Sequence, residues 1–455
     1  MAAVKQHLDQ YVGDYRDHFL VHRRDNSATA RQYLEGLLAC EKGHANMERM
    51  EEAVDGSQYR SYQQFVSNSP WEPVPVIGQV AQTASRMFAT QQTQDELPTG
   101  LLIDESAHLK KGTASVGVSR QYAGVVGKVE NCQVGVYLSL CHDTDTTLIN
   151  ERLFLPECWT DDAERCLRAG IPEEQRAHHS KPQLALAMID ESLAQGIRWD
   201  WIGGDGLYGH SAELLKGLDD RHLFYVLEVH KDERVYLEPP QIAVPPRTST
   251  RGAPPIRRQA DREPIRLDQY CATLTDDAWE EVRVRKTTKG WLRLEVHLAT
   301  VWTWDGEEAH ACQRTLLITK TLSRTPKIKY SLSNGALTAY TPQEYAYFQA
   351  QRYWVERCFD DAKNELGMSD YQVRKWLGWH HHHALVLMAC LFVLQERMQH
   401  REEAPLLSVR DARLLIIARL WGTASDVEKQ LHHLEQRHQK RKRAIAHYYP
   451  LYDDV

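Results

Sequence analysis

The hydrophobic and polar positions change their period along the chain, and this change divides it into segments. Residues 1–95 carry polar helical patterns, most clearly at 28–38 and 59–65, and predict a helical N-terminal domain. The closely spaced Pro73 and Pro75 indicate a linker at the end of this domain. Beyond residue 95 the apolar positions come in short runs, which are typical of buried strands.

An α/β pattern follows in residues 96–229. Strands are predicted at 101–103, 115–122, 132–140, 197–202 and 222–229, and helices at 182–193 and 211–218. The first strand runs into Asp104, and the fourth ends in Gly203, Gly204 and Asp205. Strands and helices in this order predict a sheet that is covered by helices.

The pattern switches to hairpins in residues 230–338. Alternating apolar positions flank a turn at Gly290, and further strands are predicted at 315–321 and 327–332. Because this block contains no marked helical pattern, we interpret it as a separate β-rich insertion.

Helical patterns resume after the insertion. A helix predicted at 342–366 opens a second part of the α/β domain, residues 339–400. Residues 401–455 are expected to form a helical C-terminal region with a basic tail. The apolar run 384–394 is too short to span a bilayer, so a buried helix is predicted there.

Composition narrows the class of protein. The chain has 455 residues, of which 42% are hydrophobic and 26% charged, the balance of a soluble globular protein. No apolar segment follows the N-terminal lysine, so we expect a cytoplasmic protein without a membrane partner. Nine cysteines occur without a Cys-x-x-Cys pair, which argues against a disulfide framework and a zinc ribbon.

Two clusters of charged or titratable residues leave alternatives open. The run His380 to His383 resembles a metal tract or a purification tag, but a helical pattern continues on both sides, and four consecutive helical positions point in different directions. The net charge of −7 does not by itself indicate a nucleic-acid partner. Five cations in the C-terminal tail form either a solvated face or a DNA contact: Arg437, Lys440, Arg441, Lys442 and Arg443.

The helix predicted at 342–366 carries two adjacent stripes. At about 100° per residue, Gln349, Arg352, Glu356 and Lys363 fall within about 60° of one another. The neighbouring stripe is apolar and comprises Phe348, Val355, Phe359, Ala362 and Leu366. The helix can therefore bury its apolar stripe against the sheet and present its charged stripe to a ligand held by Asp104 and Asp205. The alternative is an ordinary amphipathic helix with a surface ion pair of Arg352 and Glu356.

Several of these motifs resemble a known family. The spacing Arg352-x3-Glu356-x6-Lys363 is similar to the Tyr-x2-Arg-x3-Glu-x6-Lys signature of DDE transposases of bacterial insertion sequences. Segments 104–122, 131–133, 152–156, 204–209 and 378–379 also resemble one branch of these transposases. Their order and spacing cover residues 100–395. The sequence departs from the signature at Gln349, which stands in the position of the tyrosine.

The resemblance implies an RNase H-like α/β fold, a mixed sheet flanked by helices and interrupted by a β-rich insertion, in a bacterial protein that acts on DNA. It implies that Asp104, Asp205 and Glu356 are catalytic and hold two Mg²⁺ ions, for which Mn²⁺ can substitute. The implied DNA contacts are Arg352, Lys363, Lys110, Lys111, Arg120 and Gln349. Among other acids, Asp360 is the closest substitute for Glu356.

The implied activity is transposition. The protein would bind the ends of an insertion sequence through residues 1–95, cut them, and join the 3′-hydroxyl ends to target DNA as a homodimer. The segments 384–397 and 427–438 are candidates for the dimer contact. Two rivals stay open: a domesticated DNA-binding protein without catalysis, and an RNase H-fold nuclease that cuts without strand transfer.

Overall fold

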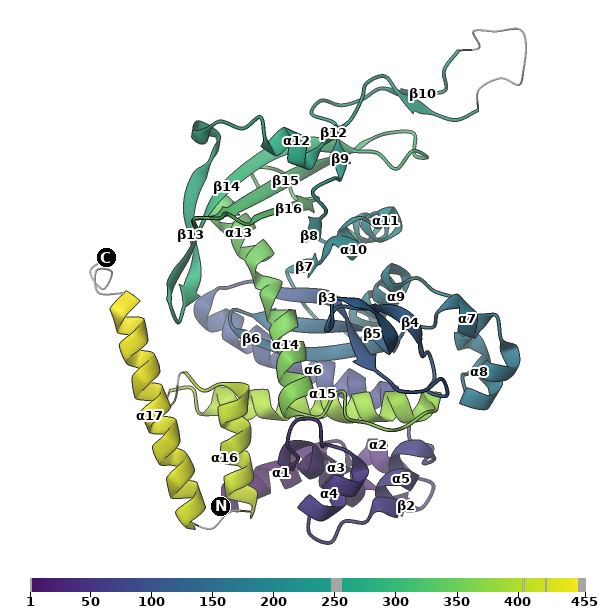
Figure 1. The fold of residues 1–455 in the computed structure, drawn as a ribbon, viewed down its shortest axis with the longest axis vertical. Helices are drawn as coiled ribbons and strands as arrows, with labels where there is room; N and C mark the ends of the chain where they lie inside the picture. Colours follow the sequence, from purple (N-terminus) through teal and green to yellow (C-terminus); the bar gives the residue numbers. More distant parts are fainter. Residues whose placement is uncertain (1, 247–255, 403, 405, 422–423, 449–455) are drawn as a thin grey trace. The chain divides into compact units, whose positions relative to one another are not determined.

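The chain forms two compact units (Figure 1). The computed structural model describes residues 2–246, 256–402, 404, 406–421 and 424–448. The first unit comprises Met1–Thr99, Ile103–Trp199 and Tyr353–Val455, and the second comprises Gly100–Leu102 and Asp200–Arg352.

The first unit begins with helices and continues with long strands. The N-terminal elements are α1 (Ala2–Asp14), α2 (Arg16–Phe19), β1 (Leu20–Val21), β2 (Arg24–Asp25), α3 (Ser27–Ala39), α4 (Met47–Ala53), α5 (Tyr59–Ser67) and α6 (Pro73–Asp95). The strands β3 (Thr99–Leu109), β4 (Ser119–Ala123), β5 (Lys128–His142) and β6 (Asp145–Leu153) precede α7 (Glu157–Thr160), α8 (Ala163–Ala169), the 3-10 turn Glu173–Gln175 and α9 (Lys181–Ala194). The chain returns to this unit for α14 (Tyr353–Glu365), α15 (Trp376–Gln399), α16 (Val409–Trp421) and α17 (Ala424–Tyr448).

β5 is the central strand of the first unit. Its first part pairs antiparallel with β4 and its second part with β6, while β3 is its neighbour on the other edge. β6 was not predicted, because its polar residues 150–152 do not fit the pattern of a buried strand. These residues find partners within the unit: Asn150 and Arg152 contact Glu191 of α9 at 3.1 and 2.5 Å, and Glu151 contacts His380 of α15 at 2.7 Å. Successive residues of a strand point to opposite faces, so α9 and α15 cover opposite faces of β6.

α6 corrects the predicted linker. Pro73 and Pro75 lie in the first turn of a 23-residue helix, where a missing backbone N–H costs no hydrogen bond. The helix packs on β5, β6 and α15. The prolines therefore start a helix of the core, and residues 1–95 share their packing with the sheet instead of forming a domain of their own.

α15 runs through the centre of the first unit, as the apolar run 384–394 predicted. The helix is long and apolar enough to cross a membrane, but 89% of its most apolar window is buried inside the protein. It packs on α3, α5, α6, α16 and β6. This burial makes it the core helix of a folded unit.

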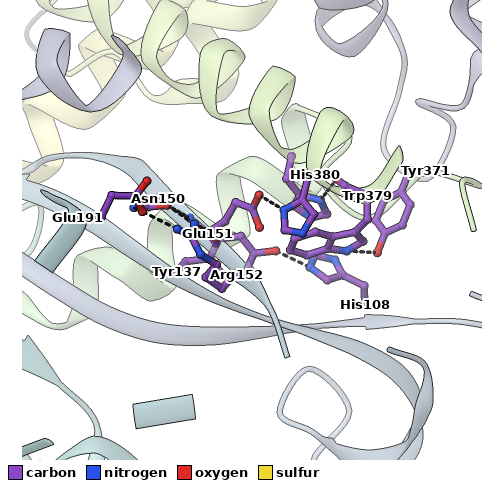
Figure 2. A network of polar contacts seen from close by, with 10 residues as sticks. His108, Tyr137, Asn150, Glu151, Arg152, Glu191, Tyr371, Trp379 and His380 are labelled. Carbon is purple, nitrogen blue, oxygen red and sulfur yellow. Dashed lines mark hydrogen bonds and ion pairs between the residues drawn. The ribbon is translucent and has the colours of Figure 1, made fainter. Parts of the chain in front are cut away.

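The four consecutive histidines of α15 are buried and have separate partners. His380 contacts Glu151, His381 lies between the carbonyl oxygens of Val66 and Trp71 at 2.9 and 2.7 Å, and His383 contacts the carbonyl of Trp379 at 2.9 Å. His382 contacts the hydroxyl of Tyr33 at 2.9 Å. The prediction that they point apart is confirmed. Figure 2 shows the neighbouring network in which Tyr371 joins Trp379, and Tyr137 joins His108.

The second unit combines a short parallel pair of strands with a broad antiparallel sheet. Its elements are β7 (Trp201–Gly204), α10 (Gly206–Gly209), α11 (Ala212–Asp220), β8 (Tyr225–Val229), β9 (Arg234–Val235), β10 (Ile242–Ala243), β11 (Gln259–Ala260), β12 (Ile265–Arg266), α12 (Leu267–Cys271), the 3-10 turn Asp276–Ala278, β13 (Glu280–Thr287), β14 (Gly290–Thr303), β15 (Cys312–Thr321), β16 (Ile328–Ser333) and α13 (Pro342–Gln351). The strand order is β13-β14-β15-β16-β8-β7, in which β7 and β8 run parallel and the other neighbouring strands run antiparallel. The predicted hairpin strands of this block are therefore confirmed.

The predicted boundary of the β-rich insertion at residue 230 is not a boundary of the fold. β16 pairs with β8 through Tyr330–Val229 and Ser333–Val226, so the hairpins extend the same sheet. The predicted helix 342–366 is likewise two helices, α13 and α14. Arg352 separates them with helical backbone angles, φ −54° and ψ −28°, and the two units meet in sequence at this residue. The sequence carries no proline or glycine here, so periodicity alone could not show the division.

Acid is expected to destabilise the first unit through the buried histidines. Burial lowers the pKa of His381 to about 4 and that of His382 to about 3. The unfolded chain, with an ordinary histidine pKa of about 6.5, binds more protons below that pH, so stability is complete above about pH 6.5 and falls toward pH 4. Each histidine contributes about 1 kcal/mol per pH unit in this window.

Denaturant unfolding followed by tryptophan fluorescence at pH 7.5 and 5.5 measures this loss. His381→Gln should reduce the pH dependence, and the exposed His179→Gln is the matched control that should leave it unchanged. Equal unfolding midpoints at both pH values in the unmodified protein would contradict this account.

Candidate active site

Asp104 lies in the middle of β3 and not at its end. The strand continues to Leu109, which corrects the predicted strand end at residue 103. The neighbouring Glu105 points to the opposite face and pairs with Lys181 of α9 at 2.8 Å. His108, on the same face as Asp104, contacts Ser369 at 3.0 Å, in the segment between α14 and α15. The alternation along β3 therefore turns Asp104 toward the side where α14 and α15 lie.

α14 brings Glu356 and Lys363 to that side of the unit. Val355, Phe359 and Ala362 are buried and pack the helix on the sheet, as the apolar stripe predicted, while Glu356 is exposed. The Lys363 ammonium donates to the carbonyl of Ala107 on β3 at 3.2 Å. This hydrogen bond ties the helix to the strand that carries Asp104.

The electrostatics of Lys363 reflect two opposing influences. Burial lowers the pKa of its ammonium, and the carboxylates of Asp360 and Asp104 act in the opposite direction. A lysine in this position offsets part of the negative charge that Asp104 brings to the face. Its hydrogen bond to the carbonyl of Ala107 positions α14 against β3.

The far end of α14 is fixed by Arg413 of α16. Its guanidinium pairs with Glu365 at 3.0 Å and donates to the carbonyls of Leu38 and Cys40 at 2.7 and 2.5 Å. A buried arginine with three such partners holds α3, α14 and α16 in one arrangement. Lys363 and Arg413 together define the position of the helix that carries Glu356.

Asp205 belongs to the second unit, where it starts α10. Its side chain accepts a hydrogen bond from the backbone N–H of Leu207 at 3.0 Å, the arrangement of an N-cap. Gly209 ends the turn against β8, and a Cβ there would come within 2.0 Å of the carbonyl oxygen of Glu228. The Gly-Asp-Gly-Leu-Tyr-Gly motif therefore holds Asp205 at the exit of β7 on a turn pressed against the neighbouring strand.

Arg352 and Gln349 are held within the second unit. The Arg352 guanidinium pairs with Glu228 of β8 at 3.0 Å. Gln349 is buried and donates to the hydroxyl of Ser331 at 2.7 Å, and its carbonyl oxygen accepts from Thr319. These contacts fasten α13 to β15 and β16. The predicted DNA contact at Gln349 does not fit this buried position, which gives the side chain a packing role.

The other predicted DNA contacts differ in exposure. Lys111 and Arg120 are exposed, and Arg120 lies 3.7 Å from Glu130. Lys110 donates to the carbonyl of Tyr371 at 3.0 Å and lies 3.4 Å from the centre of the Tyr371 ring. Burial lowers the pKa of Lys110 to about 8. Lys110 is thus an internal contact between β3 and the segment before α15, whereas the other two are available at the surface.

Comparison with known proteins decides the family. The DDE superfamily endonucleases match residues 16–291, more than half of the chain. The chain belongs to this family. It is also 25% identical over 312 residues to the probable transposase for insertion sequence element IS701 of Microchaete diplosiphon, over 68% of this chain and 67% of that protein. Among solved structures, piggyBac transposase in a synaptic complex with hairpin DNA is similar with a TM-score of 0.42 and 12% identity, covering 95% of this chain and 81% of that one.

The family assignment confirms that the protein is a DDE transposase of an insertion sequence. Its central sheet is mixed and flanked by helices, as the predicted α/β class requires. The transposase carries Asp104 and Glu356 on its first unit and Asp205 on its second. Within the residues that the structure describes, no group of three or more histidine, cysteine, aspartate or glutamate side chains is arranged to hold a metal ion.

The buried position of Gln349 gives a test of its role in the transposase. Gln349→Leu should leave the hydroxyls of Thr319 and Ser331 without their partner and lower the free energy of unfolding by about 1–3 kcal/mol. The exposed Gln343→Leu on the same helix is the matched control and should change it by less than about 0.5 kcal/mol. Denaturant unfolding measures both variants. Unchanged stability with weakened DNA binding in Gln349→Leu would restore the predicted DNA contact.

Proposed function

We propose that this transposase binds the ends of its insertion sequence, cleaves the DNA there and joins the freed 3′-hydroxyls to target DNA. The observation that carries the proposal is that Asp104 and Glu356 come from β3 and α14 on the same side of the first unit, within a chain of the DDE family. We further propose an RNase H-like catalytic domain and Asp104, Asp205 and Glu356 as its catalytic carboxylates.

The donor set suits magnesium. Carboxylate oxygens are hard ligands, which Mg²⁺ and Mn²⁺ prefer. Asp104 lies on β3, Glu356 lies on α14, and Asp205 caps α10. Two such ions, when bound, would lower the pKa of an attacking water and neutralise charge on the transferring phosphate. Asp104 would contact both ions, and Asp205 and Glu356 would each complete one.

The residues around the carboxylates then have positioning roles. Lys363 holds α14 against β3 and brings a positive charge close to Asp104. The Gly209 turn holds Asp205 at the exit of β7, and Glu228 of the neighbouring strand β8 pairs with Arg352. If Arg352 exchanges its partner Glu228 for a DNA phosphate, its planar guanidinium is suited to grip that phosphate with two hydrogen bonds.

The cleavage reaction needs no protein side chain as a general base. Water attacks the phosphorus at the element end, the P–O bond to the 3′ oxygen breaks, and a 3′-hydroxyl and a 5′-phosphate result. In strand transfer the 3′-hydroxyl attacks a target phosphodiester, so one bond is formed as one is broken. One set of carboxylates can serve both steps because the reacting groups are chemically alike.

Two ends must be paired before they are joined, so we propose a homodimer as the active form. Of the two predicted dimer contacts, 384–397 lies on α15, and its apolar part is buried within its own unit. α17 is exposed along much of its length and is the remaining candidate.

Removing any of the three carboxylates should abolish cleavage. Asp104→Asn, Asp205→Asn and Glu356→Gln should each lower the rate of Mg²⁺-dependent nicking by at least about 100-fold, because even losing a residue that only supports a metal ligand costs about 10- to 100-fold. Asp360→Asn is the matched control, since Asp360 is also an exposed acid of α14. The measurement is nicking of plasmid that carries the element ends, in Mg²⁺, Mn²⁺ or chelator. Full activity in Glu356→Gln with loss of activity in Asp360→Asn would transfer the role to Asp360.

A strand-transfer assay separates the transposase from its two rivals. An end duplex with a recessed 3′-hydroxyl should be joined covalently to plasmid by the unmodified protein in Mg²⁺. Nicking without joined products would favour the nuclease, and neither activity in Mg²⁺ or Mn²⁺ would favour a domesticated binding protein. Joined products from Asp104→Asn would contradict the assignment of the site.

A further inference from the structure

One helix of the N-terminal region exposes a face without acidic residues. From Ser57 to Trp71 the sequence contains no aspartate or glutamate, whereas α4 before it exposes Glu48, Glu51 and Glu52. At about 100° per residue, one side of α5 carries polar residues and the other is apolar. The polar side consists of Arg60, Ser61, Gln63, Gln64, Ser67 and Asn68.

The apolar side fixes α5 rigidly in the first unit. Tyr62, Phe65 and Val66 are buried, and the Phe65 ring stacks on Trp71 with centroids 5.3 Å apart. Trp71 in turn stacks on His381 of the core helix at 3.7 Å. The exposed face is therefore presented by a helix whose position is fixed by the core of the protein.

The polar side chains on this face make few contacts with the rest of the protein. In the part of the chain that the structure describes, the side-chain amides of Gln63, Gln64 and Asn68 make no hydrogen bond within the protein, and Arg60 makes no ion pair. Exposed glutamine, asparagine and arginine side chains can each form paired hydrogen bonds with base edges in the major groove. An acid-free helical face of this composition matches DNA better than it matches a basic or an apolar partner.

A hollow flanks the helix on each side, and both contain cations. The first, of about 390 Å³, is lined by Ser61 and Gln64 of α5 and by His22, Arg23 and Arg24 of the β1–β2 hairpin. The second, of about 330 Å³, is lined by Tyr59 and Gln63 of α5 and by Arg374 and Lys375 of the segment before α15. No residue that lines either hollow is acidic.

We propose that α5 reads the sequence of duplex DNA in the major groove, while the cations of the two hollows hold the phosphates on either side. Phosphate contacts set the orientation of a protein on DNA, and base contacts supply its specificity. A helix with exposed polar side chains between two hollows lined by cations can provide both kinds of contact. The inference rests on the proposed function only in taking DNA as the partner, and it assigns end recognition to particular residues.

The test separates base contacts from phosphate contacts, and it uses the full chain in chelator so that catalysis does not enter. Selection from a random duplex library first yields the sequence that the unmodified protein prefers. Binding to this duplex and to a shuffled duplex is then measured by fluorescence anisotropy. Gln63→Ala/Gln64→Ala should lower the ratio of the two affinities by about 10-fold or more. Gln6→Ala/Gln10→Ala on α1 is the matched control and should keep it.

The phosphate contacts give a different signature. Arg23→Ala/Arg24→Ala should weaken binding to both duplexes equally and reduce the slope of log affinity against log salt by about 1.8, because each phosphate contact contributes about 0.9. Lys5→Ala/Arg86→Ala removes the same charge elsewhere and should change the slope less. Selection without any preferred sequence, or an unchanged affinity ratio in Gln63→Ala/Gln64→Ala, would overturn the proposal. Because nicking is measured separately, either result leaves the catalytic proposal intact.

Discussion

The first unit depends on the burial of α15 from every side. A helix that is surrounded by protein has no solvent for its polar groups, so each polar side chain must find a partner inside. His380, His381 and His382 do so with β6, with the α5 region and with α3, respectively. The run of histidines thus sets the distances between elements that are far apart in the sequence. A metal tract or a tag would have no such set of separate partners.

The position of the proposed catalytic carboxylates follows from this packing. β3 and β6 both flank β5, and α14 and α15 contact β6, so Asp104 and Glu356 come to one side of the unit. In the second unit, Glu228 of β8 positions two neighbouring segments. Its backbone carbonyl leaves room only for glycine at position 209, and its carboxylate pairs with Arg352. The first unit carries Asp104 on β3 and Glu356 on α14, and the second carries Asp205 at the start of α10.

Much of the fold could be predicted where one face of an element is buried and the other is not. The strands from β13 to β16 alternate clearly, and α9 begins with the Ser180 capping box and is followed by Gly196 with φ +76°. The hydrophobic pattern did not predict some elements that are buried on all sides or whose polar side chains pair with other groups inside the protein. β6 contains Asn150, Glu151 and Arg152, whose partners lie on other elements, and α6 begins with prolines that also suit a linker.

Motif order predicts which residues form the site, but it does not predict the environments of those residues. Gln349 lies in the charged stripe by helical arithmetic, yet it is buried, because the hydroxyls of Thr319 and Ser331 provide polar partners beneath the helix. Lys110 was predicted to contact DNA, and its ammonium lies over the ring of Tyr371. The surroundings of these side chains depend on contacts between segments that are distant in the sequence. The order of polar and apolar residues does not reveal such contacts.

The central claim is that Asp104, Asp205 and Glu356 together bind two metal ions on DNA. Anomalous diffraction at the manganese edge, from crystals of the protein with Mn²⁺ and its preferred DNA, tests this directly. The account predicts two manganese peaks, one contacted by Asp104 and Asp205 and the other by Asp104 and Glu356. Manganese bound to Asp360 in place of Glu356, or peaks that Asp104 does not contact, would contradict it.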